Sequence, residues 1–259
     1  MNQDLNNLLQ DWPHESGQLK VRKIIGNDGK AKLQLRLDLG LIQMEMNGRP
    51  DGTRPHNSDS LLSYFQKRAK RKIGAGEPFT LTPEQCNELQ QEGLQYYHRY
   101  ISLFQVEDYP AVIRDTQRNL DMFDFIKKYA PREEIAQSME QFRPYVMMMK
   151  VRATATIELE REDYMAAIDK VQKGMEEIRA AYIEAGHPQS GEGTPEITFL
   201  EEWLEEIHQQ RPIPALERMQ RELEQAIAAE AYERAAELRD LIRAQQEQPQ
   251  QEQARQEQV

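Results

Sequence analysis

Helical periodicity governs the chain from Thr82 onward, and it limits the fold more than any other feature. Apolar residues recur there at three- and four-residue intervals, which places them along one side of successive helices. The stretch opens with Thr82-Pro83-Glu84-Gln85, where an N-cap threonine, a proline at the first helical position and a capping-box glutamine occur together. The spacing predicts helices over residues 83–105, 108–128, 132–142, 144–160, 163–184, 195–209, 214–229 and 231–247.

A shorter segment before these helices alternates with a period of two. Leu33, Leu35, Leu37 and Leu39 are separated by polar residues, and the turn sequence Gly26-Asn27-Asp28-Gly29 comes before them. After Gly40 the apolar set changes phase, so we expect a bulge or bend there that keeps both runs on one core. The sequence therefore predicts a mainly α fold of α+β type, with a small antiparallel sheet at its N-terminal end.

One phrase recurs within the helical stretch. Glu107-Asp108-Tyr109, Glu162-Asp163-Tyr164 and Glu230-Ala231-Tyr232 each follow a short turn and start a helix. The first two units resemble tetratricopeptide (TPR)-like helical hairpins, although the tryptophan-leucine-glycine opening of that family is missing. A TPR-like array and an ordinary helical bundle both remain open.

The last part of the helical stretch predicts an antiparallel hairpin of two helices. Leu216, Met219, Leu223, Ala226 and Ile227 fall at helical spacing, a short break follows, and a second apolar stripe begins. That second stripe contains Tyr232, Ala235, Ala236, Leu238 and Ile242. Small alanines would let the two backbones approach closely, while Tyr232 and Leu238 would fill the seam.

The second helix also carries Tyr-Glu-x-Ala-Ala-x-Leu-Arg-Asp-x-Ile at residues 232–242. With the preceding helix, this stretch closely resembles the UVR motif of the UvrB and UvrC excision-repair subunits, which also occurs in stress-response adaptors. The resemblance covers roughly residues 214–243. It implies a docking element that pairs with another protein and has no chemistry of its own.

The resemblance also suggests which residues make the contact. A partner would cover the apolar side chains, while two polar side chains orient it at the rim. These partner-binding candidates are Leu216, Met219, Leu223, Tyr232, Leu238, Arg239, Asp240 and Ile242. Packing of one hairpin on another would give a homodimer, the simplest closed assembly.

Charge is distributed unevenly along the chain. The net charge is −11, yet thirteen basic residues and only five acidic ones lie between Lys20 and Lys72. Such a segment can bind phosphate if its cations form a separate face, or it can pair with acidic helices of the protein or of a partner copy. No aromatic residue interleaves Lys67, Arg68, Lys70 and Arg71 in the sequence, which favours the second alternative.

A rigid turn lies within the same basic segment. Pro50-Asp51-Gly52 is flanked by Arg49 and Arg54, and a helix start at Ser58-Asp59-Ser60 follows. The two arginines could form a cradle for a carboxylate or a phosphate, because arginine presents a planar fork of donors. The alternative is a turn that only reverses the chain.

Several classes of protein are not supported by the sequence. The five histidines lack metal-ligand spacing, Cys86 is the single cysteine, and no P-loop, nucleophile elbow or dinucleotide fingerprint occurs. We therefore expect no catalytic residues, no metal and no cofactor. No apolar run reaches the length of a membrane span and the start is not a signal peptide, so we expect a cytoplasmic protein.

These patterns suggest five regions and one function. The regions are 1–76 with the sheet and a basic helix, 77–185 with TPR-like helices, 186–213 with a linker and a helix, 214–247 with the hairpin, and 248–259 as a disordered tail. The expected function is a non-enzymatic bacterial adaptor that binds another protein through the hairpin, in DNA repair or in a protein-quality-control stress response. The alternative is a nucleic-acid-associated repair factor that uses the basic N-terminal segment.

Overall fold

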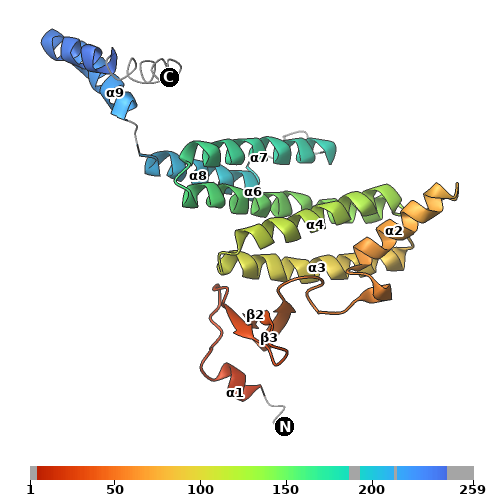
Figure 1. The fold of residues 1–259 in the computed structure, drawn as a ribbon. Helices are drawn as coiled ribbons and strands as arrows, with labels where there is room; N and C mark the ends of the chain where they lie inside the picture. The colour runs from red at the N-terminus through yellow and green to blue at the C-terminus, as the bar shows by residue number, and fades with distance from the viewer. Residues whose placement is uncertain (1–4, 187–192, 213–214, 244–259) are drawn as a thin grey trace, which may run out of the picture. The chain divides into compact units, whose positions relative to one another are not determined.

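The computed structural model describes residues 5–186, 193–212 and 215–243, and its fold is mainly α with a small antiparallel sheet, as predicted (Figure 1). The predicted tail at 248–259 and most of the predicted linker lie outside the described residues. The chain divides into two compact units, Met1–His208, here called the body, and Gln209–Val259.

The sheet has three strands, β1 (Val21–Ile25), β2 (Ala31–Leu37) and β3 (Gly40–Glu45), in the order β1-β2-β3. Leu37 pairs with Gly40, so Asp38 and Leu39 form a tight two-residue turn. The expectation of one bent strand through Leu39 was wrong, since Leu39 is 92% exposed at the tip of a hairpin. The turn reverses the chain, and this reversal explains the change of phase after Gly40.

One face of the sheet joins the core of the body. Leu33, Leu35 and Met44 are buried and pack with Tyr100 and Leu103 of α3 (Pro83–Gln105), against which the sheet lies (Figure 1). The other face is polar and also largely covered on β2. There Gln34 accepts a hydrogen bond from Arg22 at 2.8 Å and donates one to Gln43 at 2.9 Å. The central strand is thus buried on both faces.

The helices begin and end close to the predicted residues. After the short α1 (Asn6–Leu9), they are α2 (Leu61–Gly74), α3, α4 (Tyr109–Tyr129), α5 (Glu133–Glu140), α6 (Arg143–Glu160), α7 (Tyr164–Glu184), α8 (Pro195–Gln210) and α9 (Ala215–Ala228), followed by a helix over 232–243. The predicted capping box of α3 is confirmed, because Thr82 and Gln85 exchange side-chain to backbone hydrogen bonds. A second capping box, between Ser60 and Ser63, starts α2.

The long helices of the body pack mainly on their neighbours in the chain. Helix α3 packs on α4, α4 on α6 and α6 on α7 (Figure 1). Helices α6 and α7 approach so closely that a Cβ atom on Gly174 would collide with Val151. Whether this stack is TPR-like stays a prediction.

The three repeated Glu-x-Tyr phrases form the same turn. Glu107, Glu162 and Glu230 all have left-handed backbone conformations, with φ values of 62°, 60° and 57°. In each turn, the N–H of the next residue donates to a carbonyl five residues earlier, at 2.9, 2.9 and 2.8 Å. This pattern is the Schellman motif, which ends one helix and reverses the chain into the next.

Candidate docking site

The C-terminal hairpin is the candidate docking site, and the structure confirms its two helices. Helix α9 and the helix over 232–243 are joined by the third of the Schellman turns, centred on Glu230. The N–H of Ala231 closes the turn on the carbonyl of Ala226. Residues 215–243 are called the hairpin from here on.

The seam of the hairpin contains few side chains. Ala226, Ala235 and Leu238 are buried, and Met219 and Leu223 pack against them. Ile242 is also buried, at 9% exposure. All members of this apolar cluster come from the hairpin itself, so it has a core of its own. Small alanines from both helices meet there, which is the arrangement that permits close backbone approach.

The apolar side chains that face solvent overlap only in part with those predicted to bind a partner. Leu238 is only 2% exposed and already occupied within the hairpin, whereas Tyr232, expected in the seam, is 69% exposed. Tyr232 lies at the first turn of its helix, beside the buried stripe. Ile227 and Leu241 are also exposed, at 54% and 50%.

Ile227 and Leu241 are exposed apolar side chains that the predicted partner-binding set did not include. Their positions next to the buried residues of each helix were the available signal in the sequence. Leu216 belongs to α9, but its side chain lies outside the part of the chain that the structure describes.

Polar side chains frame the hairpin. Arg234 forms an ion pair across the two helices with Glu222 at 3.4 Å and another with Glu237 at 3.1 Å. The predicted rim residues Arg239 and Asp240 are exposed and lie beside each other, with their charged atoms 3.6 Å apart. These two side chains remain accessible to a partner.

Arg49, one of the predicted anion-binding residues, is part of a buried charge network. Its guanidinium forms ion pairs with Asp51 at 3.3 Å and with the fully buried carboxylate of Glu92 at 3.1 Å. Glu92 also pairs with Arg118 and accepts hydrogen bonds from the backbone N–H groups of Leu61 and Leu62. A buried carboxylate at the first turn of α2 stabilises that helix end through its unpaired N–H groups.

A second buried pair lies next to this network. Arg99 and Asp115 are both 1% exposed and form a bidentate ion pair, with distances of 2.6 and 2.8 Å. The remaining Arg99 nitrogen donates to the carbonyls of Glu45 and Gly48, so it holds the start of the loop after β3. The loop with Arg49 is therefore fastened to α3 and α4 by internal charges.

The other predicted anion-binding residues lie on the surface. Arg54 is paired with Asp59 at 2.7 Å, and both side chains are exposed. Lys67, Arg68, Lys70 and Arg71 project from α2, and none forms an ion pair with another described residue. Arg49 and Arg54 are thus both paired with acidic side chains, whereas these four cations of α2 are not.

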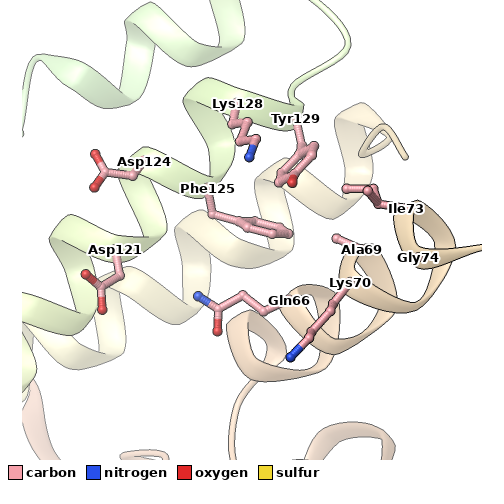
Figure 2. Close-up of a pocket in the computed structure, with 10 residues that line it drawn as sticks. All are labelled: Gln66, Ala69, Lys70, Ile73, Gly74, Asp121, Asp124, Phe125, Lys128 and Tyr129. Carbon is pink, nitrogen blue, oxygen red and sulfur yellow. The ribbon is translucent and has the colours of Figure 1, made fainter. Parts of the chain in front are cut away.

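An open trough of about 690 Å³ separates α2 from α4 (Figure 2). Its apolar floor is formed by Ala69 and Ile73 of α2 with Phe125 and Tyr129 of α4. Figure 2 shows Lys70 on the α2 side of the trough and Asp121 and Asp124 on the α4 side.

The described residues contain no group of three or more histidine, cysteine, aspartate or glutamate side chains placed to hold a metal ion. Across the described parts of the chain, no helix is both long and apolar enough to cross a membrane.

The geometry defines a helical hairpin with a small apolar core of its own and exposed apolar side chains beside it. Comparison with known families agrees, because residues 215–248 match the UvrB/uvrC (UVR) motif. The resemblance inferred from the sequence is confirmed for this part of the chain. Comparisons of the chain with curated proteins and with solved structures gave no match.

Proposed function

We propose that this protein is a non-enzymatic adaptor that binds another protein through its UVR hairpin. The observation that carries the proposal is the exposure of apolar side chains on both flanks of the hairpin seam, where Ile227, Tyr232 and Leu241 are each at least half exposed. Together with the seam that they flank, these side chains offer an apolar surface that a partner would cover. The body would then hold the hairpin and supply further surfaces.

The chemistry of the hairpin indicates the kind of partner. Apolar side chains that flank a two-helix seam are best covered by another pair of helices, because the four helices then enclose one core. Arg239 and Asp240 would set its orientation through polar contacts at the rim. A second copy of the hairpin meets this description, so a homodimer is the simplest assembly.

The motif supports a proposal for the cellular setting. The UVR motif is found in DNA-repair and protein-quality-control proteins. We place the adaptor in the cytoplasm and in one of these two pathways. A TPR-like body would suit this role, because stacked helices offer extended binding surfaces.

The first experiment measures binding by the full chain. Replacement of Ile227, Tyr232 and Leu241 by serine should weaken self-association in sedimentation velocity, or partner capture in a pull-down. Each half-exposed side chain contributes about 1 kcal/mol, so the triple change should weaken binding roughly 100-fold.

A matched control distinguishes the loss of these apolar side chains from unfolding of the hairpin. Gln220, Glu224 and Glu233 are exposed polar residues of the same two helices, and their replacement by serine should leave binding unchanged. A chain that ends after Arg211 should lose the interaction entirely. If that truncated chain retained every interaction of the full chain, the adaptor proposal would be wrong.

A further inference from the structure

One face of α2 combines cations with Tyr64, an aromatic side chain that is partly buried and packs against the core. Tyr64, Lys67, Arg68 and Arg71 are spaced by three and four residues, so they form one stripe along the helix. The stripe lies opposite the side on which Leu62, Phe65 and Ala69 are buried. From Tyr64 to Arg71 it spans about 10 Å at the helical rise of 1.5 Å per residue.

The charge of this stripe is not neutralised by the described part of the protein. Lys67, Arg68 and Arg71 form no ion pair there, and the adjacent Lys70 forms none either. Among the acids around α2, Asp59 pairs with Arg54, Glu77 with Lys72 and Asp124 with Arg143, while Asp121 accepts a hydrogen bond from Gln117. A chain of net charge −11 thus keeps a local group of unpaired cations.

The stripe also has a stacking platform at one end. The imidazole of His56 is stacked on the Tyr64 ring, with centroids 4.2 Å apart and planes inclined by 21°. His56 is exposed, and it and Asn57 have left-handed backbone conformations, with φ values of 50° and 55°. Such conformations are costly for residues other than glycine and persist only where the surrounding structure holds them.

The helix that presents the cations is fixed at its start. Glu92 accepts hydrogen bonds from the first N–H groups of α2 at 2.7 and 3.2 Å, and Ser60 caps the same turn. A ligand would therefore meet a preformed helix and would lose little affinity to ordering of the backbone.

We propose that this surface, formed by His56, Tyr64, Lys67, Arg68 and Arg71, binds single-stranded nucleic acid. The aromatic pair stacks an unpaired base, and the cations contact phosphates along the strand. Combinations of stacking rings and a basic track are typical of sequence-tolerant binding to single strands. An acidic protein is the less suitable ligand, because the stripe contains no aliphatic side chain to form the apolar core of a protein interface.

The test is fluorescence anisotropy with the full chain and a labelled 20-nucleotide oligothymidylate. Three phosphate contacts to a single strand should give a slope of about −2 for log affinity against log salt concentration. Replacement of Lys67, Arg68 and Arg71 by glutamine keeps part of each stem and removes three charges. This variant should lose at least tenfold in affinity at low salt and should show a nearly flat salt dependence.

Two further sets of variants separate the specific surface from net charge. Replacement of Arg161, Lys170 and Lys173 by glutamine removes the same charge from another exposed surface and should change affinity less than twofold. His56→Ala should weaken binding about fivefold, the lower end of the effect of losing one stacking ring. His56→Phe keeps an aromatic ring and should retain binding.

Several outcomes would overturn the proposal. One is the absence of oligothymidylate binding at low salt, and another is an equal loss in the two triple variants. Binding to a 20-base-pair duplex that is as tight as binding to the single strand would exclude base stacking. Equal competition by poly-glutamate of the same charge would assign the surface to an acidic protein instead.

Discussion

The body and the hairpin are stabilised by different kinds of interaction. In the body, the buried pair of Arg99 and Asp115 and the fully buried Glu92 connect a loop, α2, α3 and α4 inside a large apolar core. The hairpin has a short apolar seam and an ion pair between Arg234 and Glu222 that is largely exposed to solvent. Exposed ion pairs contribute little, so the stability of the hairpin depends on a few apolar contacts.

This difference in stabilisation affects how each region could bind a ligand. Buried ion pairs and hydrogen bonds hold the body in one conformation, so any binding surface on it would be preformed. A hairpin of marginal stability gains from a partner, because a ligand that binds only the folded form stabilises that form. The following changes are expected to sharpen or contradict this comparison.

The largest effect is expected from Asp115→Ala. It leaves the guanidinium of Arg99 buried without its carboxylate, and loss of one partner of a buried pair costs about 3–5 kcal/mol. Urea denaturation should show this loss in the free energy of unfolding of the body. Arg114→Ala is the control, because Arg114 contacts the same carboxylate from a side chain that is 42% exposed, and it should cost below about 1 kcal/mol.

A smaller effect is expected from Leu238→Ala in the hairpin seam. Loss of a buried leucine costs about 2–3 kcal/mol, which should unfold so small a unit on its own. Hydrogen exchange should then lose protection over residues 215–243 while the body keeps its protection. Gln220→Ala, an exposed change in the same region, should preserve exchange at both places. Loss of protection in the body would contradict the independence of the two units.

The contact between α6 and α7 should respond to added volume. Gly174→Val places a side chain against Val151 and should destabilise the body by about 1–3 kcal/mol, because overpacking forces neighbouring atoms to move. Thermal unfolding measures this change. Gly74→Ala is the control, since its added Cβ meets no atom within 4 Å. Equal effects of the two changes would show that helix contact is not the cause.

The shared Schellman turns allow the same change in both regions. Glycine adopts the left-handed conformation without steric cost, so Glu107→Gly should be about 1 kcal/mol more stable than Glu107→Ala. Glu230→Gly and Glu230→Ala should differ by a similar amount in the hairpin. Circular dichroism during urea unfolding would reveal the first difference, and hydrogen exchange the second. No difference at either residue would show that the turn is not under strain.

The smallest expected effect is on Cys86 when the hairpin is removed. Burial raises the pKa of this thiol in the body, so it should react slowly with thiol reagents until the body unfolds. Truncation after Arg211 should leave its labelling rate unchanged. Faster labelling would show that the hairpin stabilises the body.

Local signals in the sequence predicted most of the helices. The capping box at Thr82 and Gln85 places the start of α3, and the repeated Glu-x-Tyr phrases place the starts of α4 and α7, because these signals act within a few residues. The exposure of Tyr232 was not predictable in this way. It depends on which side chains of α9 pack against the second helix, and spacing along one helix does not reveal this.

The other differences between prediction and structure involve contacts or backbone conformations that the local sequence does not indicate. Arg49 and Glu92 are separated by more than forty residues, and nothing near either residue indicates their ion pair. The turn at Asp38 and Leu39 was read as part of a strand because Leu39 continues the alternation by chance. The stacking of His56 on Tyr64 was not predictable either, because it requires a left-handed backbone just before α2 that the sequence does not indicate.

The position of Glu92 has a practical consequence for anyone who divides this chain into fragments. The carboxylate belongs to α3, yet its hydrogen-bond donors come from the start of α2 and its cations from the preceding loop and from α4. A fragment that begins at residue 77 would lose these partners of Glu92, and it would also expose the apolar side chains of α3 and α4 that pack with Leu62 and Phe65 of α2. Exposed apolar surface promotes aggregation, so expression trials should retain the sheet and α2 together with the helices that follow.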